Sequence, residues 1–228
     1  MLANVLTARK RKKLLTLTSH ADMVEFLSAK LPSKSSFANE AEYLAVDLEM
    51  SGLDAKNDQI LSIGYVPIID KQVVIAQANH HLIKPEQVDL RQSAPIHQLR
   101  DIDLVEGVSL AAGISALLSA LAGRILVLHH APLDSAFLDV ACQKLYGVPL
   151  LTPTIDTLQL ERNRNQRHHS KSELSVRLGE SRRRYNLPDY HGHNAVIDAI
   201  ATAELWLAQL SHITADNQTK LSYFVKGL

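Results

Sequence analysis

Two acidic residues in a predicted β-strand are the first in the chain whose types and spacing suit the binding of a cation. Asp47 and Glu49 are two positions apart in the apolar run 43–49, and a strand places alternate side chains on one face. Adjacent carboxylates repel each other and are costly in a half-buried site unless a cation neutralises them. Mg²⁺ suits such a pair because it prefers oxygen ligands. Taken alone, however, the pair more often marks a solvated strand face.

Two further carboxylates and a histidine follow in the sequence. Asp134 comes after a short apolar strand, at a strand-to-helix turn where Asp is also a common helix N-cap. Asp198 lies near the start of an apolar helix, and a carboxylate among core-like residues needs a partner or a metal. His193 precedes that helix and titrates near neutral pH, so it could take a proton from water, although a surface-loop histidine is the simpler interpretation.

The elements that must position these residues are predicted from apolar runs and from their Gly and Pro boundaries. Three strands separated by short polar segments indicate an antiparallel meander. Alternating helices and strands follow, which predicts an α/β fold: a mixed sheet, three antiparallel strands then parallel strands, flanked by helices. The predicted strands are 43–49, 60–69, 73–83, 124–128 and 154–156, and the predicted helices are 108–121, 134–146 and 195–210.

Size and composition favour one such domain with short additions. The chain has 228 residues, 46% of them hydrophobic, and a formal net charge of zero. We divide it into an N-terminal helical basic extension (1–40), a main domain (41–212) and a C-terminal tail (213–228). Cys142 is the only cysteine and lies in an apolar stretch, so we expect a buried thiol and a reducing compartment. No apolar run reaches the length of a membrane span, and we expect a cytoplasmic protein without membrane contact.

Three motifs together resemble one enzyme family. The segments 46–53 and 58–64 form the first motif, 129–138 the second and 193–199 the third, with 155–158 similar to a strand edge between them. In this order they resemble the DEDDh exonucleases of the RNase H-like superfamily, and among these the proofreading (epsilon) type of bacterial DNA polymerase III. The resemblance runs from about residue 43 to 210.

The resemblance implies an RNase H-like fold and a specific active site. Asp47, Glu49, Asp134 and Asp198 would hold two divalent cations, Mg²⁺ or Mn²⁺, and His193 would be the general base. Two such cations clamp a phosphodiester and offset the charge of its transition state. The implied activity is a 3′→5′ exonuclease that releases nucleoside monophosphates from the 3′ ends of single-stranded DNA, in proofreading or repair.

The sequence departs from the family pattern at two places. His130 stands where the family usually has Asn, and Leu133 stands where it usually has Phe before the second-motif Asp. Neither position is a metal ligand in the family, so we expect an effect on the terminal nucleotide and not on the metals. The stretch 96–99 also lacks the small Gly-Ile-Thr type of turn that usually lies near the terminal base.

Two basic segments are candidates for contact with nucleic acid. The larger leads into the third motif and would meet the phosphate backbone, which makes binding salt-sensitive. Its predicted nucleic-acid-binding residues are Arg162, Arg164, Arg167, Lys171, Arg182, Arg183 and Arg184. The other is Arg9 to Lys13, which could bind nucleic acid or a partner or form a solvated helix end. The tail 218–224 has a weak likeness to a sliding-clamp peptide, and a polymerase or clamp is therefore a possible partner.

Other functions remain open at this level. An RNA-trimming exoribonuclease of the same family would use the same five residues. A non-catalytic module that binds nucleic acid or a polymerase is favoured only by the altered second motif and the basic segments. A generic α/β domain with acidic surface groups would gain no thermal stability from Mg²⁺ or Mn²⁺.

Overall fold

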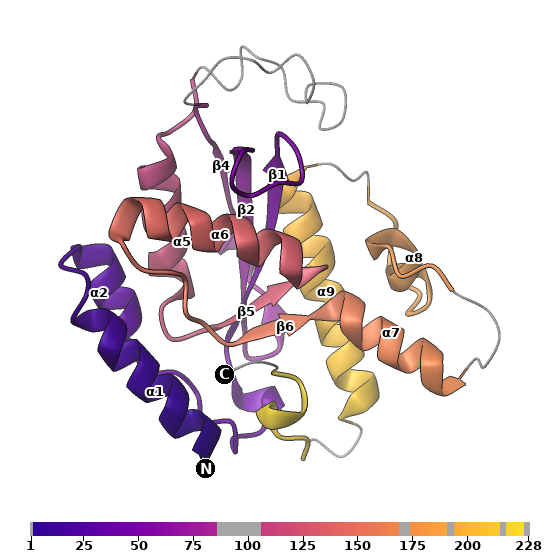
Figure 1. The fold of residues 1–228 in the computed structure, drawn as a ribbon. Coiled ribbons are helices and arrows are strands. Elements are labelled where there is room, and N and C mark those ends of the chain that lie inside the picture. The colour runs from indigo at the N-terminus through magenta and orange to yellow at the C-terminus, as the bar shows by residue number, and fades with distance from the viewer. Residues whose placement is uncertain (1, 86–105, 169–173, 191–193, 215–217, 226–228) are drawn as a thin grey trace.

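A computed structural model describes residues 2–85, 106–168, 174–190, 194–214 and 218–225 (Figure 1). The strands are β1 (Tyr43–Met50), β2 (Ile60–Ile69), β3 (Gln72–Val73), β4 (Asn79–Leu82), β5 (Ile125–Leu128) and β6 (Thr154–Asp156). The helices are α1 (Leu2–Leu15), α2 (Ala21–Ser28), α5 (Leu110–Leu121), α6 (Ala131–Tyr146), α7 (Thr157–His168), α8 (Leu178–Arg183) and α9 (Ala195–Ile213). Short 3₁₀ turns lie at Ala38–Glu40, Ile75–Gln77 and Leu221–Tyr223.

All six strands form one mixed sheet. The order is β3-β2-β1-β5-β6, and β4 also pairs with β2. Strand β1 is antiparallel to β2, and β3 and β4 are antiparallel to β2, whereas β5 is parallel to β1 and β6 is parallel to β5. The predicted arrangement of an antiparallel meander followed by parallel strands is confirmed.

Two layers of helices cover the sheet because β1 is apolar on both faces (Figure 1). Leu44, Val46 and Leu48 point into a core shared with α2, α5 and α6. Tyr43 and Ala45 point the other way, into a core shared with α9 and the C-terminal segment. Trp206 of α9 packs edge-to-face on Tyr43, with ring centroids 5.3 Å apart. Asp47 and Glu49 continue the α9-facing row, so the alternation directs both carboxylates toward α9.

Residues of the N-terminal helices pack into this core. Met23, Phe26 and Leu27 of α2 are almost fully buried in the cluster shared with α5 and α6. Arg11 of α1 is 5% exposed and hydrogen-bonds the carbonyl oxygens of Phe26, Leu27 and Leu151. The helices predicted for residues 1–40 are therefore present, but Arg11 stabilises the fold instead of forming a solvated basic surface.

The tail is equally integrated. Leu221 and Phe224 are 1% and 3% exposed, and the Phe224 ring packs edge-to-face on Trp206 at a centroid distance of 5.0 Å. Lys220 forms an antiparallel bridge with Phe37. Two of the apolar side chains that a clamp-binding peptide would insert into its partner, Leu221 and Phe224, are thus already buried within the chain, whereas Tyr223 is 50% exposed. This burial argues against the weak clamp-peptide interpretation.

Two element predictions need correction. The third strand, predicted over 73–83, is broken into β3 and β4 by the 3₁₀ turn Ile75–Gln77. Val73 pairs with Ile68 and Asn79 with Tyr65, so five residues of this segment lie opposite two residues of β2 and cannot all pair.

Helix α6 begins at Ala131, three residues before Asp134. Asp134 therefore lies in the first turn and is not the N-cap. Helix α6 ends at Gly147 in the left-handed conformation, as its glycine predicts. Within the described residues, no helix is both long and apolar enough to cross a bilayer.

Candidate active site

Carboxylates from two elements converge at the C-terminal half of β1. Asp47 and Glu49 on β1 and Asp198 on α9 each offer an oxygen, and these three atoms all lie within 4.8 Å of one another. Glu49 is 5% exposed, and Asp47 and Asp198 are half-buried. The alternation of the strand predicted that Asp47 and Glu49 share one face, and the fold adds Asp198 from 149 positions further along the chain than Glu49.

Asp134 approaches the same place from the opposite layer. It is 5% exposed in the first turn of α6, and backbone N–H groups of Asp134 itself and of Leu48 hydrogen-bond its carboxylate. Leu48 lies between the two acidic residues of β1, so this bond ties α6 to the strand at the cluster. The negative charge of Asp134 in turn contributes to raising the pKa of Asp47. The structure therefore brings together Asp47, Glu49 and Asp198 and places Asp134 close enough for its charge to act on the two acidic residues of β1.

The electrostatics of the cluster are those of crowded, buried acids. Burial, followed by the charges of Asp134, Asp198 and Glu49, raises the pKa of Asp47 well above its usual value. Burial and the charges of Asp198 and Asp134 raise the pKa of Glu49 to about 7. Burial raises the pKa of Asp134 to about 7, against the hydrogen bonds that stabilise its charged form. Ionising these groups is therefore unfavourable in the protein alone, and a divalent cation would offset that cost.

A glycine opposite Asp47 lets helix α9 approach the sheet closely enough to bring Asp198 to the acidic cluster. Gly64 on β2 pairs with Asp47, and a Cβ at position 64 would lie 2.1–2.3 Å from backbone atoms of Ala195 and Val196. These residues form the first turn of α9, so the missing side chain lets the helix start directly on the sheet. Asn194 caps the helix by accepting from the Ile197 N–H at 3.3 Å. Asp198 follows in the first turn, where the helix dipole favours a negative charge.

Asp58, which lies in the first motif but received no predicted role, holds the loop after Glu49 in place. Asp58 accepts from the Ser51 hydroxyl at 3.1 Å and from the Asp54 N–H at 2.9 Å. A Cβ at Gly52 would lie 2.4 Å from a carboxylate oxygen of Asp58, so a larger residue there would displace the Asp58 carboxylate from these bonds. This network fixes the β1–β2 connection next to the cluster.

Asp156 is another acidic residue that the sequence did not mark for a role. Its Oδ1 accepts the N–H groups of His130, Leu158 and Gln159 at 3.1–3.3 Å, which joins the starts of α6 and α7. The only sequence signal was its position at the end of the last predicted strand.

His130, in turn, has a left-handed backbone with φ of 79°. Asn and His both adopt that conformation more readily than most residues, which explains why His130 fits where the family usually has Asn.

The predicted base falls outside the described residues. His193 directly precedes the capping residue Asn194. The stretch 96–99, which departs from the family pattern, also lies outside the described residues.

His129 of the second motif is described, and both of its ring nitrogens form hydrogen bonds, with Thr157 Oγ1 at 2.8 Å and the Val176 carbonyl oxygen at 2.9 Å. Burial lowers its pKa to about 4, so it remains neutral and joins β5 to α7.

The described residues of the larger basic segment include helices α7 and α8, and four of its arginines are paired with acidic residues. Arg182 is 2% exposed, pairs with Glu204 at 2.7 Å, and donates to the carbonyl oxygens of Pro188 and Ala201. This burial contradicts the prediction that Arg182 contacts nucleic acid. Its guanidinium also lies 4.6 Å from the centroid of the Tyr190 ring.

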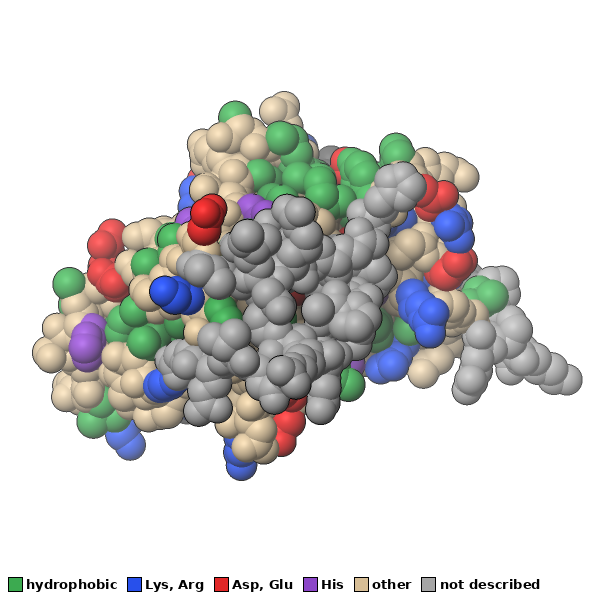
Figure 2. Space-filling model, turned by 90° about the horizontal axis from the view of Figure 1, so that it is seen from above, with side chains coloured by type: hydrophobic (Ala, Val, Ile, Leu, Met, Phe, Trp, Pro, Cys, Tyr) green, Lys and Arg blue, Asp and Glu red, His purple; other side chains and the backbone are tan. Residues whose placement is uncertain are grey.

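The neighbouring arginines have acidic partners as well. Arg183 pairs with Glu180 and Asp189, at 2.7 and 3.0 Å. Arg184 and Arg164 lie 2.9 and 3.8 Å from the fully buried Glu161, which also accepts from Tyr185 and Gln209. Arg162 is exposed, whereas the Arg167 side chain and Lys171 are outside the described structure. In Figure 2, blue and red side chains alternate on the side of α7 and α8 instead of forming one basic field.

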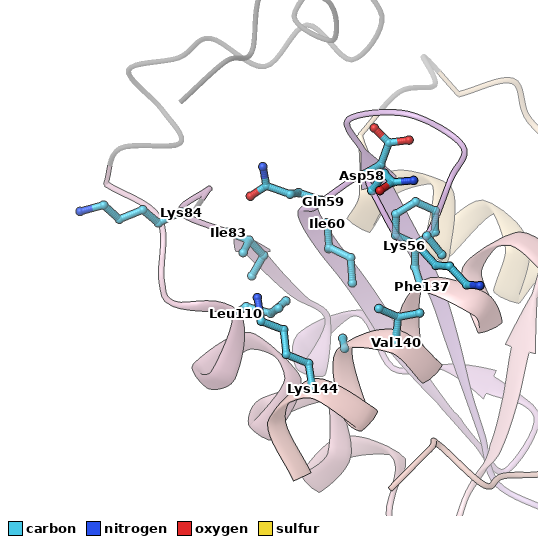
Figure 3. Close-up of a pocket in the computed structure, with 13 residues that line it drawn as sticks. Lys56, Asp58, Gln59, Ile60, Ile83, Lys84, Leu110, Phe137, Val140 and Lys144 are labelled. Carbon is cyan, nitrogen blue, oxygen red and sulfur yellow. The ribbon is translucent and has the colours of Figure 1, made fainter. Parts of the chain in front are cut away.

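A pocket of about 280 Å³ lies beside the β1–β2 loop (Figure 3). Its floor is apolar, with Ile60 and Phe137, and Phe137 is one turn beyond Asp134 on α6. The exposed Lys56, Lys84 and Lys144 lie at its edge. None of the four clustered carboxylates lines the pocket, so it adjoins the acidic cluster without containing it.

The fold and this site define an RNase H-like nuclease architecture, and comparison with known proteins gives the family. The exonuclease family model of the RNase T type matches residues 44–206. The chain therefore belongs to this exonuclease family, and within it to the DEDDh 3′→5′ exonucleases of the epsilon-like kind. A divalent-metal requirement is a property of that family, and the acidic cluster fits it.

Individual relatives agree with this assignment. The chain is 32% identical over 200 residues to a PolC-type DNA polymerase III of Thermotoga petrophila; the match covers 87% of this chain but only 14% of that protein. Exonuclease I of E. coli in complex with a dT13 oligonucleotide superposes with a TM-score of 0.63 at 14% identity, over 75% of this chain and 41% of that one. The nuclease domain of 3′hExo, a DEDDh family member bound to rAMP, gives 0.62 at 12% identity, over 78% and 95%.

Proposed function

We propose that this chain hydrolyses phosphodiester bonds one at a time from the 3′ end of single-stranded DNA and releases nucleoside monophosphates. The observation that carries the proposal is the convergence of Asp47, Glu49 and Asp198 within 4.8 Å, with Asp134 bonded to β1 beside them. Single-stranded DNA is favoured because the exonuclease I structure with the same fold holds a dT13 oligonucleotide.

The four carboxylates would hold Mg²⁺ or Mn²⁺, and the donor set fits these ions. All four side chains offer oxygen, the ligand that hard divalent cations prefer. Burial, together with repulsion from neighbouring carboxylates, raises the pKa values of three of them, which is the expected signature of a site completed by positive charge. Bound cations would supply Lewis-acid stabilisation of the charge that develops on the phosphoryl oxygens.

The protein would supply position and proton transfer. The Leu48 hydrogen bond fixes α6 against β1, and Gly64 lets α9 start directly on β2, so the carboxylates need little reorganisation during the reaction. His193 directly precedes Asn194, the cap of α9, and would accept the proton of the attacking water. This role as the base rests on the resemblance of the third motif to the family.

We infer that the strand passes the pocket of Figure 3, because Lys56 and Lys84 are exposed at its edge, whereas four of the predicted arginines are held in ion pairs. Lys56 and Lys84 belong to different segments at the pocket edge, as expected for contacts to successive phosphates. Lys56→Glu and Lys84→Glu should each raise KM and weaken the salt dependence of digestion, whereas Lys13→Glu on α1 should change neither. Equal effects of all three variants would contradict this path.

The test of the function is digestion of 5′-labelled single-stranded DNA with Mg²⁺, with Mn²⁺ and with EDTA. We expect a ladder that shortens from the 3′ end, disappears with EDTA and disappears in Asp134→Asn. The matched control is Asp139→Asn, because Asp139 lies on the same helix and bonds the Leu150 N–H instead of joining the cluster.

Competition between DNA and RNA strands of one sequence in the same assay checks the substrate. Preferential loss of the RNA strand would replace the DNA proposal with RNA trimming. Tight, salt-dependent binding of both strands without any turnover would indicate a non-catalytic module.

A further inference from the structure

A second cavity lies at the opposite end of the sheet from the acidic cluster. It has a volume of about 670 Å³ and is bordered by α1, the segment after α2, the start of β5 and the C-terminal segment. Ile125 at its edge pairs with Tyr43, four residues before Asp47 on β1, which corresponds to roughly 13 Å along the strand. Figure 1 shows both chain ends on this side of the molecule.

The cavity combines aliphatic walls with a basic rim. Its walls include Leu15, Leu27, Leu31, Ile125 and Val225. Four of its lining residues are basic, and none of the described lining residues is acidic or aromatic. The basic residues are Arg11, Lys12, Lys30 and Lys34.

Arg11 strengthens the charge argument because it is buried and pairs with no carboxylate of the described residues. Its three nitrogens donate to the neutral carbonyl oxygens of Phe26, Leu27 and Leu151, and its guanidinium lies 4.8 Å from the centroid of the Phe26 ring. Carbonyl oxygens satisfy the donors but do not cancel the positive charge. An acidic group entering the cavity would do so in a poorly solvated place, where the attraction is stronger than at the surface.

We propose that this cavity docks a segment of a partner protein in which aliphatic side chains are flanked by Asp or Glu. The aliphatic side chains would fill the cavity, and the acidic ones would meet Lys12 and Lys30 at its rim. Anchoring side chains in a pocket surrounded by complementary charge is the usual arrangement of a strong protein contact.

Two other acidic ligands fit the cavity less well. Single-stranded nucleic acid binds through basic grooves that also offer aromatic rings for base stacking, and the described lining has no aromatic residue. An anionic membrane takes up protruding apolar side chains, whereas here the apolar side chains line a hollow. The proposal does not depend on the exonuclease function, because the cavity and the acidic cluster share no residue.

The test is selection of random linear peptides displayed on phage against the full chain. Clones that also bind Ala29→Trp are removed, because a tryptophan at this lining position fills the cavity. We expect the remaining peptides to combine Leu, Ile or Val with Asp or Glu. A synthetic copy of the best peptide should bind about tenfold more weakly to the double variant Lys12→Glu, Lys30→Glu, since two attractive charges become repulsive.

Lys13→Glu is the matched control, because Lys13 neighbours Lys12 on α1 but does not line the cavity. It should bind the peptide like the unaltered chain, and all of these variants should digest single-stranded DNA normally. The proposal is overturned if selection yields no acidic, aliphatic peptides, or if the charge reversals do not weaken binding. Displacement of the peptide by an oligonucleotide, or by vesicles of anionic lipid, would assign the cavity to that ligand instead.

Discussion

Replacing Glu49 with glutamine should make the metal-free protein more stable at neutral to alkaline pH. Glu49 is 5% exposed, and burial with the charges of Asp198 and Asp134 raises its pKa from 4.5 to about 7. A tenfold change in proton affinity is worth about 1.4 kcal/mol, so keeping Glu49 ionised costs the folded state about 3 kcal/mol. Glutamine has a similar shape and no charge, and it removes this cost.

The direction of the pH dependence follows from the raised pKa. Between 4.5 and about 7 the folded chain keeps a proton on Glu49 that the unfolded chain releases. Stability therefore falls as pH rises through this window, and the penalty is complete above it. The gain from Glu49→Gln should be near zero below the window and about 3 kcal/mol above it.

Urea unfolding in EDTA at several pH values measures this difference, with Glu25→Gln, at an exposed position on α2, as the control. Mg²⁺ should then stabilise the unaltered chain more than Glu49→Gln, because cation binding is linked to folding. The reasoning is refuted if the two proteins have the same stability in EDTA across the pH range, or if the difference is as large below the window as above it.

Three further predictions concern positions that the fold singles out. Gly64→Ala should lower the free energy of unfolding by about 1–3 kcal/mol and remove most of the activity, because its Cβ would collide with the first turn of α9. The same urea and digestion assays measure this, and Gly179→Ala, which has open space around it, is the control. Arg182→Met should cost about 3–5 kcal/mol, because it leaves Glu204 without its buried partner, whereas the exposed neighbouring variant Arg183→Met should melt close to the unaltered chain. Cys142 should resist thiol reagents until the chain unfolds, because burial raises its pKa to about 12; fast labelling of the native protein would contradict this.

The local arrangement of the site could be predicted from the amino-acid sequence. Alternation along β1 placed Asp47 and Glu49 on one face, and the apolar pattern of α9 placed Asp198 near the start of a helix. Three motifs in order indicated the family, and the mixed sheet of antiparallel and then parallel strands followed from the meander and the later alternation of helices and strands. These features depend on residues close in sequence, where period and propensity act.

Only the tertiary structure shows which charged residues remain available to a ligand. Arg182 is neutralised by Glu204, 22 positions away, and Arg11 donates to Leu151, 140 positions away. The approach of α9 to β2 at Gly64 is likewise a contact between distant segments. Burial and ion pairing depend on which segments contact each other across the core. Composition and local sequence pattern do not specify these contacts.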